Sequence, residues 1–237
     1  MTTMTPVTAR YPIRQAQYDA FWADGFLVVP QLIESSLVPM LHDEYDRAIA
    51  GEFGDLKWSN SAKMGQQVQK PVHPGAIPGW DKHPYRLNGQ SVCEQLMGVD
   101  LVFRYGQMIR KPAHYPARVQ WHQDGWYWQD DKNSINAHKG CTCWVALSEA
   151  FPANGSVMYI TGSHRLGLLE HTDQSAIFEF DNAREAQGFD PSKAVAVTMY
   201  PGDAVFHHPL TVHGSGGNET DVVREGLTSH FFVANEA

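Results

Sequence analysis

A histidine and an aspartate stand two positions apart in the segment VQWHQDGWYW, residues 119–128. His122 and Asp124 both have side chains that can bind metals, yet the residues around them are typical of an apolar strand. In a strand, residues i and i+2 point to the same side of the sheet. The spacing therefore indicates that His122 and Asp124 can hold one metal ion together.

Two other pairs share this spacing, so the pair alone is a weak signal. His171 and Asp173 lie in LLEHTDQS, which has no strand pattern, and His42 and Glu44 fall on a predicted helix, where positions i and i+2 do not face each other. Accidental pairs are expected among 12 histidines. A third ligand is needed before a metal site is inferred.

The segment PGDAVFHHPLTVHGSGGN, residues 201–218, places His213 between a short strand and a glycine-rich loop. Two histidines and one carboxylate leave coordination positions open, as in non-heme Fe(II) oxygenases. His207 and His208 are alternative ligands, and strand alternation sends them to opposite faces. Arg224 then opens an apolar strand, and burying its charge is costly unless a group such as a ligand carboxylate pairs with it.

The composition is that of an ordinary folded protein. The chain has 237 residues, of which 43% are hydrophobic and 19% charged, and its net charge is −8. We predict a flexible leader over residues 1–14 and a single domain over residues 15–237. The acidic balance argues against nucleic acid or an anionic membrane as a partner. No apolar run reaches the roughly 18 residues of a membrane span, and no apolar signal core precedes the domain. We expect a cytoplasmic protein, and the sequence leaves its oligomeric state open.

Three cysteines do not make a disulfide framework. Cys141 and Cys143 form a C-x-C pair in a predicted strand, with both sulfurs on one face, and Cys93 lies far away in the sequence. A two-thiolate metal site is the alternative interpretation, although zinc sites usually have four ligands.

The surrounding pattern predicts a β-rich fold. A helix is expected within the segment 15–26, with its end at Gly25. Further helices are expected at 35–53 and at 90–98, and an irregular segment at 70–84. Short strands rich in β-branched or aromatic residues follow, separated by turn residues, at 101–111, 117–124, 140–147, 155–160, 193–200, 203–208 and 224–233. This pattern favours a double-sheet jelly roll with helices packed outside it.

Five segments and one arginine occur in the order seen in a known family. They are DGFLVV, MIRKP, WHQD, NGSVMYITGSH and PGDAVFHHPLTVHGSGGN, followed by Arg224. From residue 14 to its end, the chain resembles the phytanoyl-CoA dioxygenase family of Fe(II)/2-oxoglutarate-dependent oxygenases. The resemblance implies a double-stranded β-helix, the cupin-like form of the jelly roll.

The family pattern also implies roles for individual residues. It implies catalytic Fe(II) ligands at His122, Asp124 and His213. It implies 2-oxoglutarate contacts at Arg224, Ser215, Trp144, Gln107 and Gln67.

Substrate contacts are expected from position alone. A loop that leaves a metal ligand overhangs the open coordination site, so Trp126 and Trp128 are candidates for a substrate wall. Packing in the core or in a lid is the alternative for both. Arg110 and Lys111 are candidates to meet an anionic substrate.

The resemblance implies a dioxygenase that uses Fe(II), 2-oxoglutarate and O2. The expected reaction is hydroxylation of an unactivated C–H bond of a small organic molecule, with release of succinate and CO2. Desaturation, cyclisation or epimerisation of a specialised metabolite would use the same ligands, and a non-catalytic jelly-roll binding protein is a further alternative. The presence of Asp124 disfavours halogenation, because the halogenating branch has a small residue there. No residue identifies the substrate.

Overall fold

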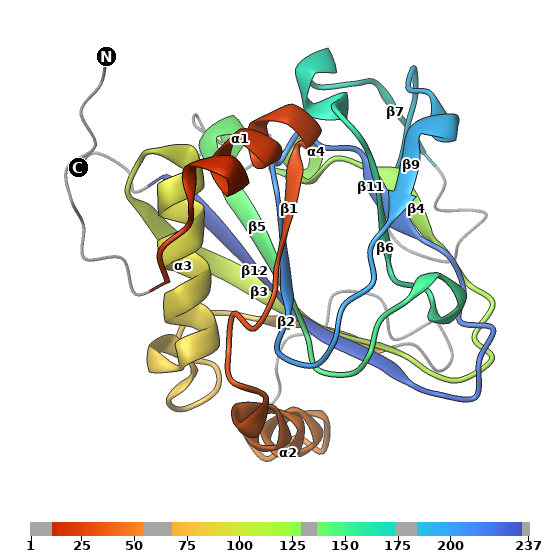
Figure 1. Ribbon diagram of the computed structural model, residues 1–237. Coiled ribbons are helices and arrows are strands. Elements are labelled where there is room, and N and C mark those ends of the chain that lie inside the picture. Colours follow the sequence, from red (N-terminus) through yellow and green to blue (C-terminus); the bar gives the residue numbers. More distant parts are fainter. Residues whose placement is uncertain (1–10, 55–67, 129–136, 174–183, 234–237) are drawn as a thin grey trace.

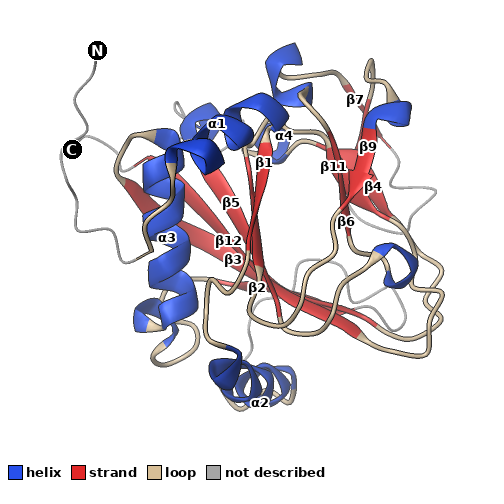
Figure 2. Cartoon of the chain, viewed as in Figure 1, coloured by secondary structure: helices blue, strands red, loops and turns tan. Residues whose placement is uncertain are grey.

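Two antiparallel sheets face each other, and the larger one carries helices on its outer side (Figure 1). The computed structural model describes residues 11–54, 68–128, 137–173 and 184–233. Figure 2 shows the strands gathered into these two layers, with the helices at the periphery. The predicted jelly roll is therefore confirmed.

Six strands form the larger sheet, and four form the smaller one. In spatial order the larger sheet contains β1 (Phe26–Val29), β10 (Ala204–His207), β5 (Cys141–Ala146), β12 (Arg224–Val233), β3 (Leu101–Lys111) and β2 (Val68–Val72). The smaller sheet contains β4 (Val119–His122), β11 (His213–Ser215), β6 (Val157–Ile160) and β9 (Ala194–Ala196). A separate hairpin pairs β7 (His171–Asp173) with β8 (Arg184–Ala186).

Helices pack mainly against the larger sheet. The α-helices are α1 (Gln15–Asp24), α2 (Val38–Ile49), α3 (Pro84–Met97) and the short α4 (Asp124–Tyr127). Single 3-10 turns occur at Ser35–Leu37, Trp80–Lys82, Ala137–Lys139, Pro152–Asn154, Ser163–Leu166 and Pro191–Lys193. Gly25 ends α1 as predicted, because its φ of 86° lets its N–H reach the carbonyl of Phe21 at 2.7 Å. Among the described residues, no helix has the length and apolar character needed to cross a bilayer.

Residues of the larger sheet alternate between two environments. On β5, Cys141, Cys143 and Val145 face the helices and join the main apolar core, whereas Thr142 and Trp144 face the space between the sheets. Every residue of β5 is buried, which explains why its sequence is a nearly continuous apolar run instead of an alternation of polar and apolar residues. The inner positions are free to carry chemistry because the outer ones hold the helices.

The cysteines belong to the outer environment. Cys141 and Cys143 lie on one face, as predicted, and pack with Cys93 in the apolar core. Burial raises the pKa of the Cys143 thiol well above its usual range, which disfavours a thiolate. The described residues contain one group that could hold a metal ion, and these cysteines are not in it. The two-thiolate interpretation is therefore not supported.

Several elements outside the site differ from the prediction. The helix expected at 90–98 begins earlier, at Pro84, because a proline suits the first turn and the side chain of His83 caps the helix by accepting the N–H of Tyr85 at 3.2 Å. The segment expected to be irregular contributes part of β2, an edge strand that pairs with β3 and tolerates a proline. The helix expected at 35–53 is a 3-10 turn followed by α2.

A candidate metal centre beside a cationic pocket

The metal-capable residues come from the smaller sheet and from the turn that follows β4. His122 ends β4 and lies opposite His213 of β11 in the register. We had predicted that the strand continues to Asp124, but it ends at His122 and Asp124 begins α4. The buried side chain of Gln123 fixes this change of direction by donating hydrogen bonds to the carbonyls of Gly167 at 2.9 Å and of Leu210 at 2.6 Å. The chain therefore turns Asp124 toward the histidines by a bend rather than by strand alternation.

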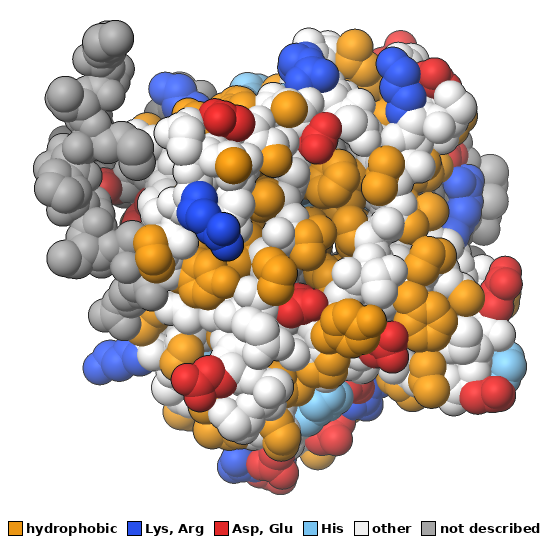
Figure 3. Space-filling view, viewed as in Figure 1, with side chains coloured by type: hydrophobic (Ala, Val, Ile, Leu, Met, Phe, Trp, Pro, Cys, Tyr) orange, Lys and Arg blue, Asp and Glu red, His pale blue; other side chains and the backbone are white. Residues whose placement is uncertain are grey.

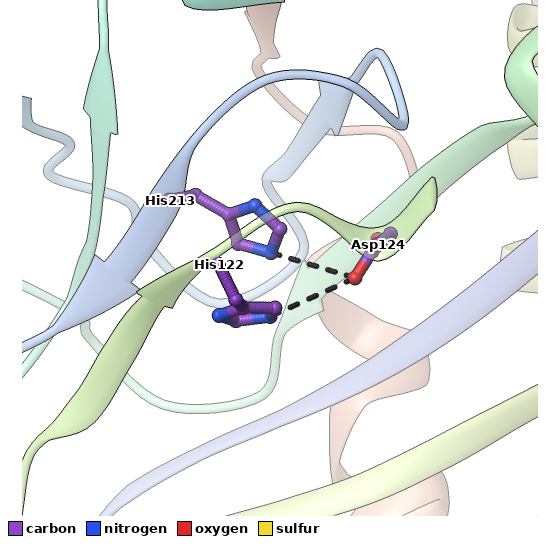
Figure 4. A group of neighbouring side chains, drawn as sticks. All are labelled: His122, Asp124 and His213. Atoms are coloured by element: carbon purple, nitrogen blue, oxygen red, sulfur yellow. Dashed lines mark ion pairs between the residues drawn. The ribbon is translucent and has the colours of Figure 1, made fainter. Parts of the chain in front are cut away.

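The three side chains converge on one point (Figure 4). The distance from Asp124 Oδ1 to Nε2 is 3.7 Å for His122 and 3.6 Å for His213. The three ligand atoms all lie within 4.8 Å of one another. Two imidazole nitrogens and one carboxylate oxygen form a facial ligand set for a transition metal.

Backbone carbonyls fix the tautomers of both histidines. His122 Nδ1 lies 2.8 Å from the carbonyl of Gln120, and His213 Nδ1 lies 2.9 Å from that of Thr211. A carbonyl only accepts hydrogen bonds, so each Nδ1 carries the proton. Each Nε2 is then left with a lone pair directed at the common point, which is how metal-binding histidines are usually held.

The protonation states also suit a metal. Burial, together with the neighbouring His213, lowers the pKa of His122 to about 4. Burial and His207 lower that of His213 to about 4. Burial alone would raise the pKa of Asp124, but His213 and His207 bring it well below its usual range. At neutral pH the site therefore offers two neutral imidazoles and one carboxylate, the forms that bind metal.

Three further residues, Thr142, His207 and His230, surround the second oxygen of Asp124. Its Oδ2 accepts hydrogen bonds from Thr142 Oγ1 at 2.6 Å and from His207 Nε2 at 2.9 Å, while His230 Nδ1 lies 3.6 Å away. His207 was predicted only as an alternative ligand. The two histidines lie on opposite faces, as predicted: His207 faces the cavity, whereas His208 packs outside the cavity against Trp22.

The cavity runs from these ligands toward β12. Its lining includes four of the residues expected to contact 2-oxoglutarate, which are Gln107, Trp144, Ser215 and Arg224. The fifth, Gln67, lies outside the described residues. The apolar part of the cavity lining includes Ile109, Val119, Val157 and Tyr159.

Two buried basic side chains lie together at the β12 end of the site: Arg224 lines the cavity, and Lys111 contacts the lining residue Ser215. Arg224 pairs with Lys111 in the register of β12 and β3, and both side chains are almost fully buried. Lys111 Nζ donates to Ser215 Oγ at 2.8 Å, and Arg224 donates to the carbonyl of Gly155 at 2.8 Å. Within the described parts of the chain, neither side chain forms an ion pair, and Arg224 Nε has no hydrogen-bond partner.

Burial disfavours the charged form of both side chains. It lowers the pKa of Lys111 to about 6, with a further contribution from Arg224, so Lys111 is largely a neutral amine at neutral pH. Burial lowers the pKa of Arg224 only to about 10, so the guanidinium stays charged. A buried cation without a counter-charge is costly unless a ligand supplies one. This end of the cavity therefore fits a carboxylate or a similar anion.

Trp144 forms the wall beside Arg224. The guanidinium carbon lies 5.5 Å from the ring centroid, and the indole N–H has no partner among the described residues. A Cβ at Gly226 would come within 2.1 Å of the ring, so only glycine leaves room for Trp144 in this position.

The residues expected to contact substrate do not line this cavity. Trp128 is 2% exposed, packs on Phe232 and donates to the hydroxyl of Tyr105 at 3.0 Å, which matches the alternative of core packing. Trp126 lies against His171, with ring centroids 5.3 Å apart.

Arg110, which was expected to meet an anionic substrate, lies away from this cavity. It lies on the outer face of β3 and forms ion pairs with Asp46 of α2 and with Glu225 of β12. Strand alternation places Lys111 inside and Arg110 outside, so Arg110 stabilises the packing of α2 and does not meet a substrate in the cavity.

The two other histidine–carboxylate pairs noted in the sequence, His171 with Asp173 and His42 with Glu44, do not form metal sites among the described residues. His171 Nε2 accepts the N–H of Gln123 at 3.2 Å, and Asp173 forms an ion pair with Arg184 at 2.9 Å. His42 pairs with Glu225 at 2.8 Å.

The chain matches one protein family over most of its length. The family model described as phytanoyl-CoA dioxygenase (PhyH) matches residues 21–226. The human peroxisomal phytanoyl-CoA dioxygenase is 24% identical over 90% of this chain and 66% of its own length. A probable phytanoyl-CoA dioxygenase of Caenorhabditis elegans is 34% identical over 38% of this chain and 30% of its own length. The chain thus covers less than two thirds of these relatives.

Bacterial proteins match over larger shares of their length. The ectoine dioxygenase of Stutzerimonas stutzeri is 25% identical over 94% of this chain and 77% of its own length. The crystal structure of EvdO2 from Micromonospora carbonacea var. aurantiaca, complexed with 2-oxoglutarate, superposes with a TM-score of 0.75 at 26% identity, covering 94% of this chain and 92% of that one. The fold, the order of the motifs and the match over residues 21–226 establish that the chain belongs to the phytanoyl-CoA dioxygenase family.

Proposed function

We propose that this protein is an Fe(II)- and 2-oxoglutarate-dependent dioxygenase that hydroxylates a C–H bond of a small organic molecule and releases succinate and CO2. One observation carries the proposal: a facial set of two neutral histidines and one ionised aspartate shares a cavity with Arg224, a buried cation that has no counter-charge among the described residues. His122, Asp124 and His213 would hold the iron.

The cationic end supports a role in binding 2-oxoglutarate. This co-substrate has a carboxylate at each end, so one end can bind the metal while the other meets Arg224. Ser215 and Trp144 line the same part of the cavity, and Lys111 reaches it through its hydrogen bond to Ser215. EvdO2, which is 26% identical, has been crystallised with 2-oxoglutarate.

Each group of residues would have a distinct task. The fork of Arg224 would hold the far carboxylate of 2-oxoglutarate and so orient the co-substrate in the cavity. The walls formed by Trp144, Tyr159 and Ile109 would limit the access of water to the site. Iron bound with the co-substrate supplies the oxidising chemistry, and the protein supplies position and a dry environment.

A small molecule fits the surface better than a polyanion does. The net charge is −8, and Figure 3 shows acidic and basic side chains scattered over the visible face among hydrophobic ones. The similar protein from Stutzerimonas stutzeri is named for ectoine, a small molecule. We accordingly propose a small organic substrate, a single catalytic domain over residues 15–237 and a cytoplasmic location.

Succinate formation tests the proposal. Iron-loaded protein would be incubated with 2-oxoglutarate, O2 and a panel of small molecules that begins with ectoine. We expect at least one compound to raise succinate above the background and to gain one oxygen atom, as seen by mass spectrometry. The variant His213→Gln should form no succinate. If wild-type and variant form equal amounts, the proposal is wrong.

A further inference from the structure

The two oxygens of Asp124 have different surroundings. Oδ1 lies 3.7 Å from His122 Nε2 and 3.6 Å from His213 Nε2. Oδ2 accepts one hydrogen bond from Thr142 Oγ1 at 2.6 Å and another from His207 Nε2 at 2.9 Å. Because Oδ2 is occupied by these donors, the carboxylate has one oxygen left for a metal.

Both nitrogens of the His207 ring are engaged. An ionised carboxylate only accepts hydrogen bonds, so Nε2 must carry the proton that it shares with Asp124. Nδ1 lies 3.1 Å from the hydroxyl of Tyr159 and accepts its proton. His207 is 3% exposed and its ring centroid is 4.3 Å from that of His213, so it lies close to the metal position without a lone pair to offer.

A second chain of hydrogen bonds reaches the same oxygen. Thr142 gives its proton to Oδ2, so its own oxygen can accept from His230 Nδ1, which is 3.0 Å away. The Tyr159–His207 chain and the His230–Thr142 chain therefore come from different strands and end on one atom. This arrangement restrains the carboxylate from two sides.

We propose that His207 is a positioning residue that keeps Asp124 as a one-oxygen ligand, and that Tyr159 fixes the tautomer His207 needs for this task. The inference rests on the proposed function, because it assumes that His122, Asp124 and His213 bind a metal. A second carboxylate oxygen on the metal would close one of the open positions that the facial set provides for 2-oxoglutarate and O2. Mutating a residue that orients a metal ligand by hydrogen bonding typically lowers metal affinity by about 10–100-fold.

Titration with Co(II), a visible probe of the metal site, tests the proposal without turnover. His207→Leu removes the donor, and we expect Co(II) affinity to fall by about 10–100-fold and the visible Co(II) bands to change as the carboxylate rotates. His207→Gln restores an N–H donor and should recover most of the affinity. His208→Leu is the matched control: this neighbouring buried histidine packs against Trp22 and should leave Co(II) affinity unchanged.

Two results would overturn the proposal. One is wild-type affinity and wild-type bands in His207→Leu. The other is loss of Co(II) binding in both His207 variants as complete as in His213→Gln, which would make His207 a ligand. Tyr159→Phe keeps the ring and removes only its hydroxyl, so it serves if His207→Leu does not fold. We expect a few-fold weakening in this variant, and unchanged affinity would count against the proposal. Failure of the wild type to bind Co(II) would instead contradict the proposed function.

Discussion

The two faces of the larger sheet use the same strands for opposite purposes. On β12, Arg224 and His230 point into the cavity, whereas Glu225 and Phe231 point toward the helices. The buried charge on the outer face is paired, since Glu225 contacts both Arg110 and His42. The buried charge on the inner face has no carboxylate partner among the described residues.

The paired charge on the outer face contributes to the stability of the fold, whereas the unpaired charge on the inner face is suited to binding a ligand. A buried charge whose partners lie within the chain contributes to packing, and here it fastens α2 to β12. A buried charge without such a partner is a cost that a ligand can remove. Adjacent residues such as Arg224 and Glu225 should therefore respond very differently to substitution.

The largest effect is expected for the metal ligands. His213→Ala or His122→Ala removes a ligand of a facial set, and iron retention should be abolished while the outer face stays intact. Iron content after gel filtration, with circular dichroism to check the fold, measures this. His42→Ala, on the outer face, should retain iron. Iron retained at wild-type levels by either ligand variant would contradict the assignment.

The next effect compares two arginines that face opposite sides. Arg224→Leu should raise the 2-oxoglutarate concentration required for binding by about two orders of magnitude, since truncating one partner of a buried charge pair costs about 2–5 kcal/mol. Arg110→Leu should lower stability and leave that requirement nearly unchanged. Binding titrations and urea unfolding of both variants give the ranking. The opposite ranking would show that the inner face does not hold the co-substrate.

A smaller effect is expected where the cavity wall is crowded. In Gly226→Ala the new methyl group must displace Trp144, because the Cβ would lie 2.1 Å from the ring. We expect a loss of stability of about 1–3 kcal/mol and weaker binding of 2-oxoglutarate. Gly216→Ala is the control, since a Cβ there has no atom within 4 Å. If thermal unfolding shows both variants to be equally stable, the close packing of Trp144 against Gly226 is contradicted.

The smallest effect concerns pH. His42 Nδ1 faces the carboxylate of Glu225 and Nε2 faces the carbonyl of Leu147, at 2.8 and 2.9 Å, so only the protonated ring can donate to both. The hydrogen bond to Glu225 raises the pKa of His42 above its usual value of 6.5. Its stabilisation should be fully present below that value and should disappear as pH rises through the higher folded-state pKa.

Paired unfolding curves measure this contribution. The difference in unfolding free energy between the wild type and His42→Gln should be larger at pH 6 than at pH 8, both chosen as roughly bracketing the His range. A difference that grows with pH would reverse the sign and rule out this pairing.

Much of the site was predictable because its signals are local. His122, Asp124 and His213 were found from short segments, and the structure brings them together. The family resemblance assigned Ser215, in the glycine-rich segment, and Arg224, which follows that segment, to 2-oxoglutarate binding, and both line the cavity.

The rest depends on strand pairing, which a single sequence does not reveal. Thr142 and His230 support Asp124 only because β10, β5 and β12 lie side by side. Arg110 and Lys111 look equivalent in MIRKP, and a shift of one residue in a strand exchanges the inner and outer faces. The register of β3 against β12 decides that Lys111 lies inside.

Secondary structure shows the same division. The expected strand at 101–111 coincides with β3, because its long β-branched and aromatic pattern is unambiguous. β2 and the short hairpin of β7 and β8 form through pairing partners rather than through their own sequence pattern. The bend at Gln123 that redirects Asp124 likewise depends on contacts with distant backbone.

The most direct measurement is an anaerobic visible titration of the metal-free protein with Fe(II) and then with 2-oxoglutarate. If the inner face holds both, a charge-transfer band should appear only when both are present, and Arg224→Leu should need a much higher 2-oxoglutarate concentration to reach it. If Fe(II) binds and no band forms at any 2-oxoglutarate concentration, the cationic end of the cavity serves another anion and the central claim is contradicted.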